Sequence, residues 1–155
     1  MGQLQIKDQI VLFDDADADV VGAYQWHLHP TGRSTYARGF QRGARSSGLV
    51  YLHRLLTNAS KGQDVDHENG DGLDNRRRNL RVCSRTQNNA NRHVSSSATG
   101  VKGVHFESFT GRWRAEIQHN RKRIKLGRFD TQEAAAMAYQ NKAAELFGRF
   151  ARRVG

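Results

Sequence analysis

Asp66-His67-Glu68-Asn69-Gly70 opens a short, arginine-rich segment in which carboxylates, an imidazole and carboxamides recur at close spacing. The segment continues with Leu73-Asp74-Asn75-Arg76, Asn79-Leu80-Arg81 and Gln87-Asn88-Asn89. Hydrolysis of a phosphodiester needs a base for water, a cation for the phosphate and the leaving oxygen, and a scaffold that holds both in line. The segment contains side chains for all of these tasks, so it indicates a metal-dependent hydrolytic site.

The carboxylate and the imidazole of this segment are adjacent in the sequence. Asp66 is a hard oxygen ligand of the kind that Mg²⁺ prefers, and the carboxamide of Asn88 is a second oxygen donor. His67 is suited to general-base work near neutral pH. Neighbouring side chains of a strand point to opposite faces, so both reach one site only if the strand bends. The Asn69-Gly70 turn supplies a reason for such a bend.

The remaining polar side chains of the segment are expected to support this site. Asn79 is expected to bridge backbone groups across the loop and to hold His67 in orientation. The arginines are expected to contact phosphates, and they are Arg76, Arg77, Arg78, Arg81 and Arg85. Taken alone, the acidic stretch also fits a solvated turn, but the complete set of motifs favours the site.

Residues 50–92 resemble the HNH endonucleases that occur free-standing or in introns of bacteriophages and that have a ββα-metal fold. The resemblance implies that His67 is the general base, that Asp66 and Asn88 bind the metal, and that Asn79 is the structural asparagine. The last motif position is Asn rather than His, which resembles the magnesium branch and argues against a zinc-holding variant. The implied cofactor is therefore a divalent metal, Mg²⁺, with Mn²⁺ as the alternative.

A further histidine precedes the segment. His53, in Leu52-His53-Arg54-Leu55, falls on a recurrent His-Arg pair of the same family. The resemblance implies a supporting or phosphate-contact role for it. A buried, hydrogen-bonded histidine is the equal alternative, and the residues alone leave the two open.

The charge of the chain points to a polyanionic partner. Its 155 residues carry a net charge of +10, and only 37% of them are hydrophobic, so small modules with shallow cores are expected. Residues 1–60 carry six Lys/Arg against five Asp/Glu, and 61–99 carry seven against five. Residues 100–155 carry twelve against five, which makes the last third the expected electrostatic anchor on nucleic acid.

Cysteine usage and hydropathy indicate the compartment. Cys83 is the only cysteine, so neither an internal disulfide nor a cysteine-based zinc site is expected. Cys83 itself is expected as a small buried residue at the end of a strand. No apolar run approaches the ~20 residues that span a bilayer, and no signal peptide is visible. These features predict a cytoplasmic protein without membrane contact, in a bacterial host cell if the chain is phage-encoded.

The pattern predicts an α+β fold whose HNH nuclease domain covers residues 1–93. Residues 1–56 are expected as a small N-terminal antiparallel sheet that leads into a ββα-metal core at 57–93. A polar turn is expected over residues 14–19. Ser84 and Gln87 form a capping-box pattern that predicts a helix from about Arg85 to Arg92. The expected strands of the N-terminal sheet are Ile10–Phe13, Tyr24–Leu28, Thr35–Phe40 and Leu49–Leu52.

Residues 94–100 are expected as a polar linker, and residues 101–155 as a separate three-stranded antiparallel sheet packed on one helix. Asp130 with Glu133 is expected to cap that helix, and Gly148 is expected to end it. The expected strands are Gly103–Phe106, Trp113–Ile117 and Arg123–Leu126. Along the second strand Arg112, Arg114 and Glu116 alternate with Trp113, Ala115 and Ile117.

The last block resembles the Apetala/ethylene-response-factor DNA-binding domain known from plants and from phage nucleases. The matching motifs are Lys102-Gly103-Val104, Gly111-Arg112-Trp113-Arg114-Ala115-Glu116-Ile117, Leu126-Gly127-Arg128-Phe129-Asp130-Thr131 and Glu133-Ala134-Ala135. In that family the sheet lies in the major groove. The implied DNA-binding side chains here, together with the alternation, are Lys102, His105, Arg112, Arg114, Arg123 and Lys125.

These features predict a metal-dependent endonuclease that hydrolyses phosphodiester bonds in double-stranded DNA. One metal site per chain predicts nicking by a monomer or weak homodimer, without a small-molecule cofactor, and the C-terminal sheet is the expected DNA anchor. Homing, genome packaging and host DNA breakdown stay open as purposes. The first alternative is a non-catalytic DNA-binding regulator with a vestigial nuclease fold. The second is an RNA-binding module, which is disfavoured because no exposed aromatic platform is expected on the basic strands.

Overall fold

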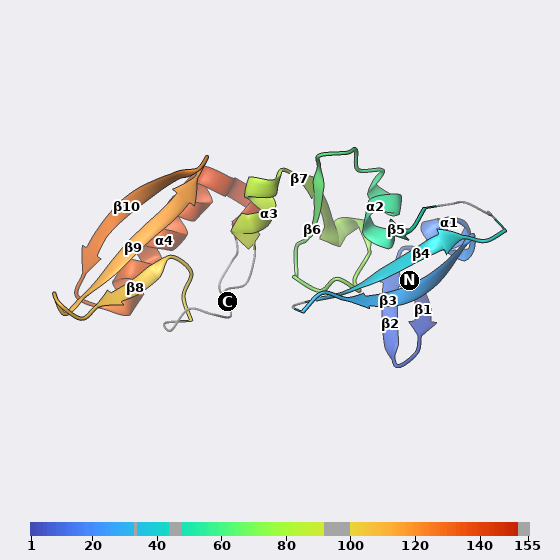
Figure 1. The fold of residues 1–155 in the computed structure, drawn as a ribbon, viewed down its shortest axis with the longest axis horizontal. Coiled ribbons are helices and arrows are strands. Elements are labelled where there is room, and N and C mark those ends of the chain that lie inside the picture. Colours follow the sequence, from blue (N-terminus) through green and yellow to red (C-terminus); the bar gives the residue numbers. More distant parts are fainter. Residues whose placement is uncertain (33, 44–47, 92–99, 152–155) are drawn as a thin grey trace. The chain divides into compact units, whose positions relative to one another are not determined.

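The structure, a computed structural model, describes residues 1–32, 34–43, 48–91 and 100–151. Its fold is mixed, with several small antiparallel sheets and few helices, which confirms the predicted class at this level (Figure 1). The chain divides into two compact units, Met1–Ser84 and Arg85–Gly155. All of the predicted linker except Gly100 lies outside the described residues.

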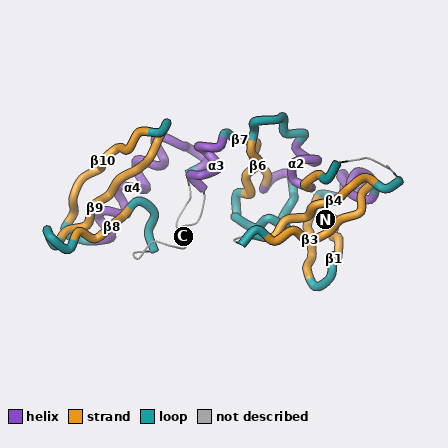
Figure 2. Tube along the Cα trace, viewed as in Figure 1, coloured by secondary structure: helices purple, strands orange, loops and turns teal. Residues whose placement is uncertain are grey.

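A hairpin that the sequence pattern did not predict in full opens the first unit. β1 (Gly2–Ile6) pairs antiparallel with β2 (Gln9–Phe13), and Lys7 has a φ of 54° in the turn between them (Figure 2). The backbone N–H of Leu12 donates to the carbonyl of Leu73 over 2.9 Å, and Leu12 in turn accepts from the N–H of Asn75 over 2.8 Å. The hairpin therefore holds the loop that contains the predicted site.

A three-stranded antiparallel sheet follows, formed by β3 (Tyr24–Pro30), β4 (Thr35–Gln41) and β5 (Val50–Tyr51) in that order. The first two strands lie where the pattern predicts them. The prediction that a strand continues through Leu52 is wrong, because α2 (Leu52–Thr57) begins there. Leu52 and Leu56 are four residues apart, which places both on one side of a helix turned toward the core.

The acidic stretch that was expected as a polar turn is partly helical. It contains the short helix η1 (Asp15–Asp17) and the start of α1 (Ala18–Gly22). Asp17 is buried, and its carboxylate accepts hydrogen bonds from Arg77, 60 positions further along the chain. Sequence periodicity gives no sign of so distant a partner, and without one a buried carboxylate would be destabilising.

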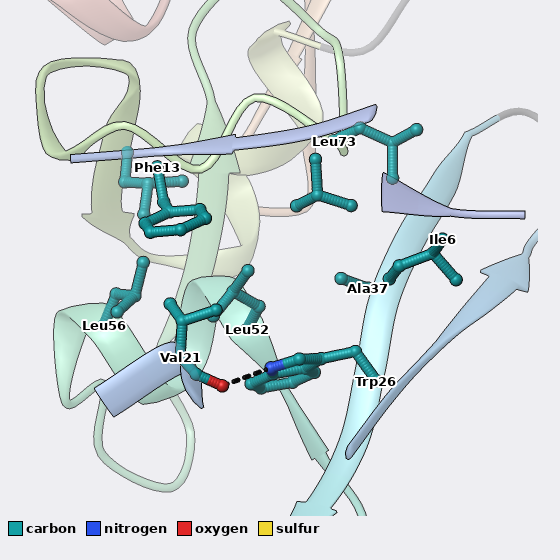
Figure 3. Packing of buried hydrophobic residues seen from close by; sticks show 10 residues of the cluster. Ile6, Phe13, Val21, Trp26, Ala37, Leu52, Leu56 and Leu73 are labelled. Atoms are coloured by element: carbon teal, nitrogen blue, oxygen red, sulfur yellow. Dashed lines mark hydrogen bonds between the residues drawn. The ribbon is translucent and has the colours of Figure 1, made fainter. Parts of the chain in front are cut away.

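The core of the first unit lies between the hairpin, the sheet and α2 (Figure 3). Trp26 reaches it from β3, and its indole Nε1 donates to the carbonyl oxygen of Val21 over 2.8 Å, which satisfies the one polar atom of the ring. The buried apolar residues are Ile6, Val11, Phe13, Val21, Trp26, Ala37, Leu52, Leu56, Leu73 and Leu80.

The segment with the predicted site forms a second, smaller hairpin. β6 (Asp64–His67) pairs antiparallel with β7 (Leu80–Cys83), and the short helix η2 (Arg77–Asn79) leads into β7. Cys83 is buried at the end of β7, as predicted. The specific ββα-metal arrangement stays a prediction, because the helix that follows β7 belongs to the second unit.

The second unit begins with α3 (Arg85–Asn91), which starts at the predicted residue. Its sheet consists of β8 (Val104–Glu107), β9 (Arg112–His119) and β10 (Lys122–Phe129), ordered β10-β9-β8 and antiparallel throughout. The three strands lie where the pattern predicts them. Among the described residues, no helix has the length and apolar character that a bilayer crossing requires.

One long helix, α4 (Gln132–Phe147), packs on this sheet and is followed by η3 (Gly148–Phe150). The predicted cap is displaced by one residue: Thr131 is the N-cap, and its hydroxyl oxygen accepts from the backbone N–H three residues on, over 3.2 Å. Asp130 instead forms an exposed ion pair with Arg112 over 3.2 Å. Gly148 is the C-cap with a φ of 52°, as predicted.

Candidate active site

The two residues at the end of β6 are both buried, and they contact different partners. Asp66 lies opposite Arg81 on β7, and its carboxylate accepts from Arg81 Nε over 3.0 Å and also from Nη2. His67 lies opposite Leu80, and its ring contacts other side chains. This follows the alternation of a strand. The charge of Asp66 nevertheless acts on His67, since it raises the pKa of the imidazole.

The imidazole of His67 lies in an aromatic and amide environment. Its ring centroid is 5.1 Å from that of His53 and 5.7 Å from that of Tyr36, and its Nε2 is 3.5 Å from Oδ1 of Asn75. Burial lowers the pKa of His67, against the opposing effects of Asn75 and the nearby carboxylates. The ring is therefore neutral at neutral pH, which is the state of a base ready to accept a proton.

Asn75 is a functional candidate that the sequence prediction did not assign, although it lies within one of the quoted motifs. Its side chain is fully buried. Its Nδ2 lies 3.1 Å from the carbonyl oxygen of Leu73 and 3.4 Å from that of Gly72. Because the amide nitrogen donates to those carbonyls, the amide oxygen is the atom that faces His67.

Asn79 connects the two ends of the loop. Its Nδ2 donates to the carbonyl oxygen of Asp74 over 2.7 Å, and its Oδ1 accepts from the backbone N–H of Asn69 over 3.0 Å. The backbone N–H of Glu68 also donates to the Asn79 carbonyl over 2.9 Å. The side chain thus bridges backbone groups across the loop, which is the geometry expected for it. Its effect on catalysis stays a prediction.

Three of the predicted phosphate-contact arginines are held by carboxylates of the first unit. Arg76 forms two hydrogen bonds with Asp74, of 2.7 and 2.6 Å. Arg77 donates to Asp17 over 2.6 and 3.0 Å, with its side chain 59% exposed. Arg81 differs from the expectation of a surface contact, because its side chain is buried on Asp66. A buried carboxylate recruits a guanidinium to offset its charge.

His53 lies in a group of rings. Its centroid is 5.4 Å from that of Tyr51 and 5.3 Å from that of Tyr36. Its Nδ1 is buried and has no hydrogen-bond partner among the described residues, so the hydrogen-bonded alternative is not supported at this atom. Burial, with smaller contributions from the charges of His67 and Arg54, lowers the pKa of His53 to about 3.

This shift predicts a pH dependence of stability. The unfolded chain binds a proton at His53 below pH 6.5, whereas the folded chain does so only near pH 3. The contribution of neutral His53 to the free energy of unfolding is therefore fully present above pH 6.5. It is lost as the pH falls toward 3, by up to ~1.4 kcal/mol per pH unit. We expect His53→Phe, which keeps a ring in the stack, to lose about 3 kcal/mol less of its unfolding free energy than the wild type between pH 6.5 and 4.

The measurement is urea unfolding at several pH values in a Trp113→Phe background, where Trp26 is the only tryptophan and reports the first unit. Unfolding curves at pH 7 provide the reference for both proteins. An identical loss of unfolding free energy in both proteins would contradict the assigned pKa, because the variant lacks the titrating group.

Asp66 is adjacent to His67 in the sequence, but its side chain is buried on Arg81. Within the described ranges, no three His, Cys, Asp or Glu side chains lie close enough together to hold an ion. The role of Asp66 as a metal ligand stays a prediction, in which water and phosphate oxygens would complete the site for Mg²⁺. Asn88, the second predicted ligand, lies on α3 of the second unit. Its role as a ligand stays a prediction.

The outer face of the second unit's sheet carries a network of guanidinium and carboxylate groups. Arg114 pairs with Glu107 over 3.1 Å and with Glu116 over 3.5 Å. Arg128 pairs with Glu107 over 2.6 Å, and Arg123 with Glu116 over 3.5 Å. The two carboxylates therefore orient three exposed or half-exposed guanidinium groups on one surface, and cations remain in excess there.

Arg128 was not among the predicted DNA contacts, and a β-bulge is the reason. The register shifts between Lys125 and Gly127, which adds one residue to β10. The extra residue reverses the alternation, so Arg128 pairs with Arg114 and joins the outer face, while Phe129 turns to the other side. The period-two alternation of a strand sequence does not predict such a shift.

The other predicted contacts of this unit lie in different environments. His105 and Lys125 are exposed, and Arg112 is 54% exposed. Lys102 instead donates to the carbonyl oxygen of Ala90 over 3.1 Å and to that of Asn89 at the end of α3. The expectation that the basic strands lack exposed rings is wrong for Phe106, which is 53% exposed on β8.

Comparison with known proteins finds a nuclease family in the segment that contains His67. Residues 50–90 match a family model described as HNH endonuclease. The chain is 29% identical over 134 residues to "Uncharacterized HNH endonuclease L560" of Acanthamoeba polyphaga mimivirus, which covers 85% of this chain and 67% of that protein. These matches support nuclease function in general.

A second relative is named as a transcription factor. The chain is 30% identical over 118 residues to "AP2-like ethylene-responsive transcription factor TOE2" of Arabidopsis thaliana, which covers 76% of this chain. The match spans only 21% of that protein, so a DNA-binding role for residues 101–155 stays a prediction. No solved structure shows a significant match to the chain.

Proposed function

We propose, from the likeness of residues 50–90 to HNH endonucleases, that this chain is a metal-dependent endonuclease that nicks double-stranded DNA. The observation that carries the proposal is the environment of His67. A neutral, buried imidazole faces the amide oxygen of Asn75 and lies next to Asp66 in the strand. A base of this kind is what activation of water against a phosphodiester requires.

Asn75 assigns the two ring nitrogens of His67 to different tasks. Its amide oxygen accepts, so the favourable tautomer of His67 carries its proton on Nε2. In this tautomer Nδ1 is the nitrogen without a proton, and it would take the proton from water. The bond is long at 3.5 Å, and it shortens as the ring becomes positively charged, because a charged donor binds an amide oxygen more strongly.

Asp66 and Asn88 are the residues that would hold the metal. When bound, a divalent ion supplies positive charge for the phosphate and the departing oxygen. Arg81 compensates the buried charge of Asp66 in the protein as it stands, and it orients the carboxylate through two hydrogen bonds to Oδ2. We therefore assign Arg81 the positioning of Asp66, in place of the surface phosphate contact expected from sequence.

The remaining cations bind the phosphates of the substrate. Arg78 is exposed on η2. Arg77 lies on the same short helix and is 59% exposed, although it pairs with Asp17. Arg76 and Arg85 stay predicted contacts. On the second unit, the outer sheet face with its oriented guanidinium groups is the proposed anchor on duplex DNA, which gives an affinity that falls steeply with salt.

The test uses supercoiled plasmid, Mg²⁺ or Mn²⁺, and the full chain, with EDTA as the control. We expect open-circular product to accumulate before linear product, because one site per chain cuts one strand at a time. EDTA is expected to abolish nicking and to leave duplex binding on gels intact. A chain that shifts duplex DNA but leaves the plasmid supercoiled with either metal would instead be the non-catalytic regulator.

A further inference from the structure

The sheet of the first unit has a second face that the catalytic proposal does not use. Residues on β3 and β4 alternate, and Trp26 and Ala37 point into the core. The residues between them point the other way, and Tyr51 of β5 pairs with Arg38 in the same row. We call this surface the aromatic face, and it consists of His27, His29, Tyr36, Arg38, Phe40 and Tyr51.

The rings of the aromatic face form two groups, His27 with Phe40 and His29 with Tyr36 and Tyr51, and the second group reaches His67. His27 lies 5.8 Å from Phe40 between ring centroids, and the next cross-strand partner of His27 is Arg38. The Arg38 guanidinium lies 5.5 Å from the centroid of Tyr51. Tyr51 is stacked on His53, which in turn lies 5.1 Å from His67. A DNA strand bound along these rings would therefore extend to His67, the proposed base.

Cations predominate in the segment that forms this face, whereas the carboxylates Asp66, Asp71 and Asp74 lie near His67 at its end. Residues 20–63 contain no Asp or Glu, but they contain six cations, Arg33, Arg38, Arg42, Arg45, Arg54 and Lys61. Within the described residues, no carboxylate pairs with Arg38, Arg42 or Arg54, whereas Arg76, Arg77 and Arg81 all have one. The charge of the face is therefore complementary to a polyanion.

We infer that the aromatic face binds a single-stranded stretch of DNA next to the scissile phosphate. This inference rests on the proposed nuclease function. Rings and cations combined on one sheet face are the arrangement that binds single strands, because every base has a flat surface that stacks on a ring. A duplex exposes base edges rather than base faces, so its bases cannot stack on these rings. The face selects DNA that is unpaired or distorted at the cleavage site.

The first test measures binding by the full chain in EDTA, where no cleavage occurs. Fluorescence anisotropy compares a labelled single strand, its fully paired duplex, and a duplex with a central unpaired tract. We expect Phe40→Ala to weaken binding of the single strand and of the interrupted duplex by about 5- to 100-fold, as the loss of one stacking ring does. The paired duplex is expected to change little, because the second unit binds it.

Ile10→Ala is the matched control, since Ile10 is an exposed apolar side chain of the same unit outside the face. A direct readout needs no variant: 2-aminopurine in the unpaired tract is expected to be quenched by the wild type through stacking. Hydrolysis of bis(p-nitrophenyl) phosphate, which has no strand to stack, is expected to be unchanged in Phe40→Ala.

Three results would overturn the inference. In the first, Phe40→Ala and Tyr51→Ala bind every DNA as tightly as the wild type does. In the second, Phe40→Ala loses as much affinity for the paired duplex as for the single strand. In the third, sedimentation shows a dimer that Phe40→Ala dissociates, which would make the face an interface between two copies. If the wild type binds the single strand through Phe40 but does not nick the plasmid, the nuclease proposal is contradicted. The inference about the aromatic face would still hold.

Discussion

His67→Ala is expected to lower the rate of plasmid nicking by about 10²- to 10⁴-fold, the range that a positioned general base contributes. The substitution removes the neutral imidazole that follows Asp66 on β6 and that is the proposed base. Duplex affinity is expected to stay at the wild-type value, because no predicted phosphate contact is altered. The measurement is single-turnover nicking with enzyme in excess, together with gel shifts in EDTA.

Added imidazole provides a specific check of this prediction, because it can replace the missing base without restoring the fold. We expect it to recover part of the nicking rate of His67→Ala and to leave the wild type unchanged. His119→Ala is the control for loss of a histidine; its ring packs 5.6 Å from Phe147 in the second unit. Nicking by His67→Ala at the wild-type rate would remove His67 from the mechanism.

Arg81→Ala is expected to lower the unfolding free energy of the first unit by about 3–5 kcal/mol. Arg81 and Asp66 have side chains only 6% exposed, so the substitution leaves a buried carboxylate without its main counter-charge. The measurement is urea unfolding followed by Trp26 fluorescence in the Trp113→Phe background. Asp15→Asn is the control: it breaks an exposed pair with the N-terminus and is expected to change stability by less than about 1 kcal/mol.

The double variant Asp66→Leu/Arg81→Met separates loss of a pair from loss of packing. Replacement of both charges by apolar side chains of similar size is often neutral. We therefore expect the double variant to regain most of the stability lost in Arg81→Ala, while it remains inactive in nicking because Asp66 is gone. A double variant as unstable as Arg81→Ala would show that packing of the Arg81 side chain, rather than its charge, carries the effect.

Local pattern is sufficient for several elements of this chain, because their signals lie within a few neighbouring residues. Alternation locates β3, β4 and the sheet of the second unit, and a capping pattern locates the start of α3. The same reasoning is wrong at Leu52, where a helix begins, and one residue early at Thr131. Hydrophobic runs of four residues do not distinguish a strand from a helix, and adjacent Asp and Thr are both good caps.

The site follows the same division. The motif around His67 is readable from residue types and spacing, since the chemistry of water activation demands a small set of side chains close together in the chain. The partners of those side chains are not readable: Arg81 on Asp66, Arg77 on Asp17, and Leu12 against the loop join segments distant in sequence. Such pairings arise because buried charges and backbone groups must find partners wherever the folded chain brings them, and no local pattern records that choice.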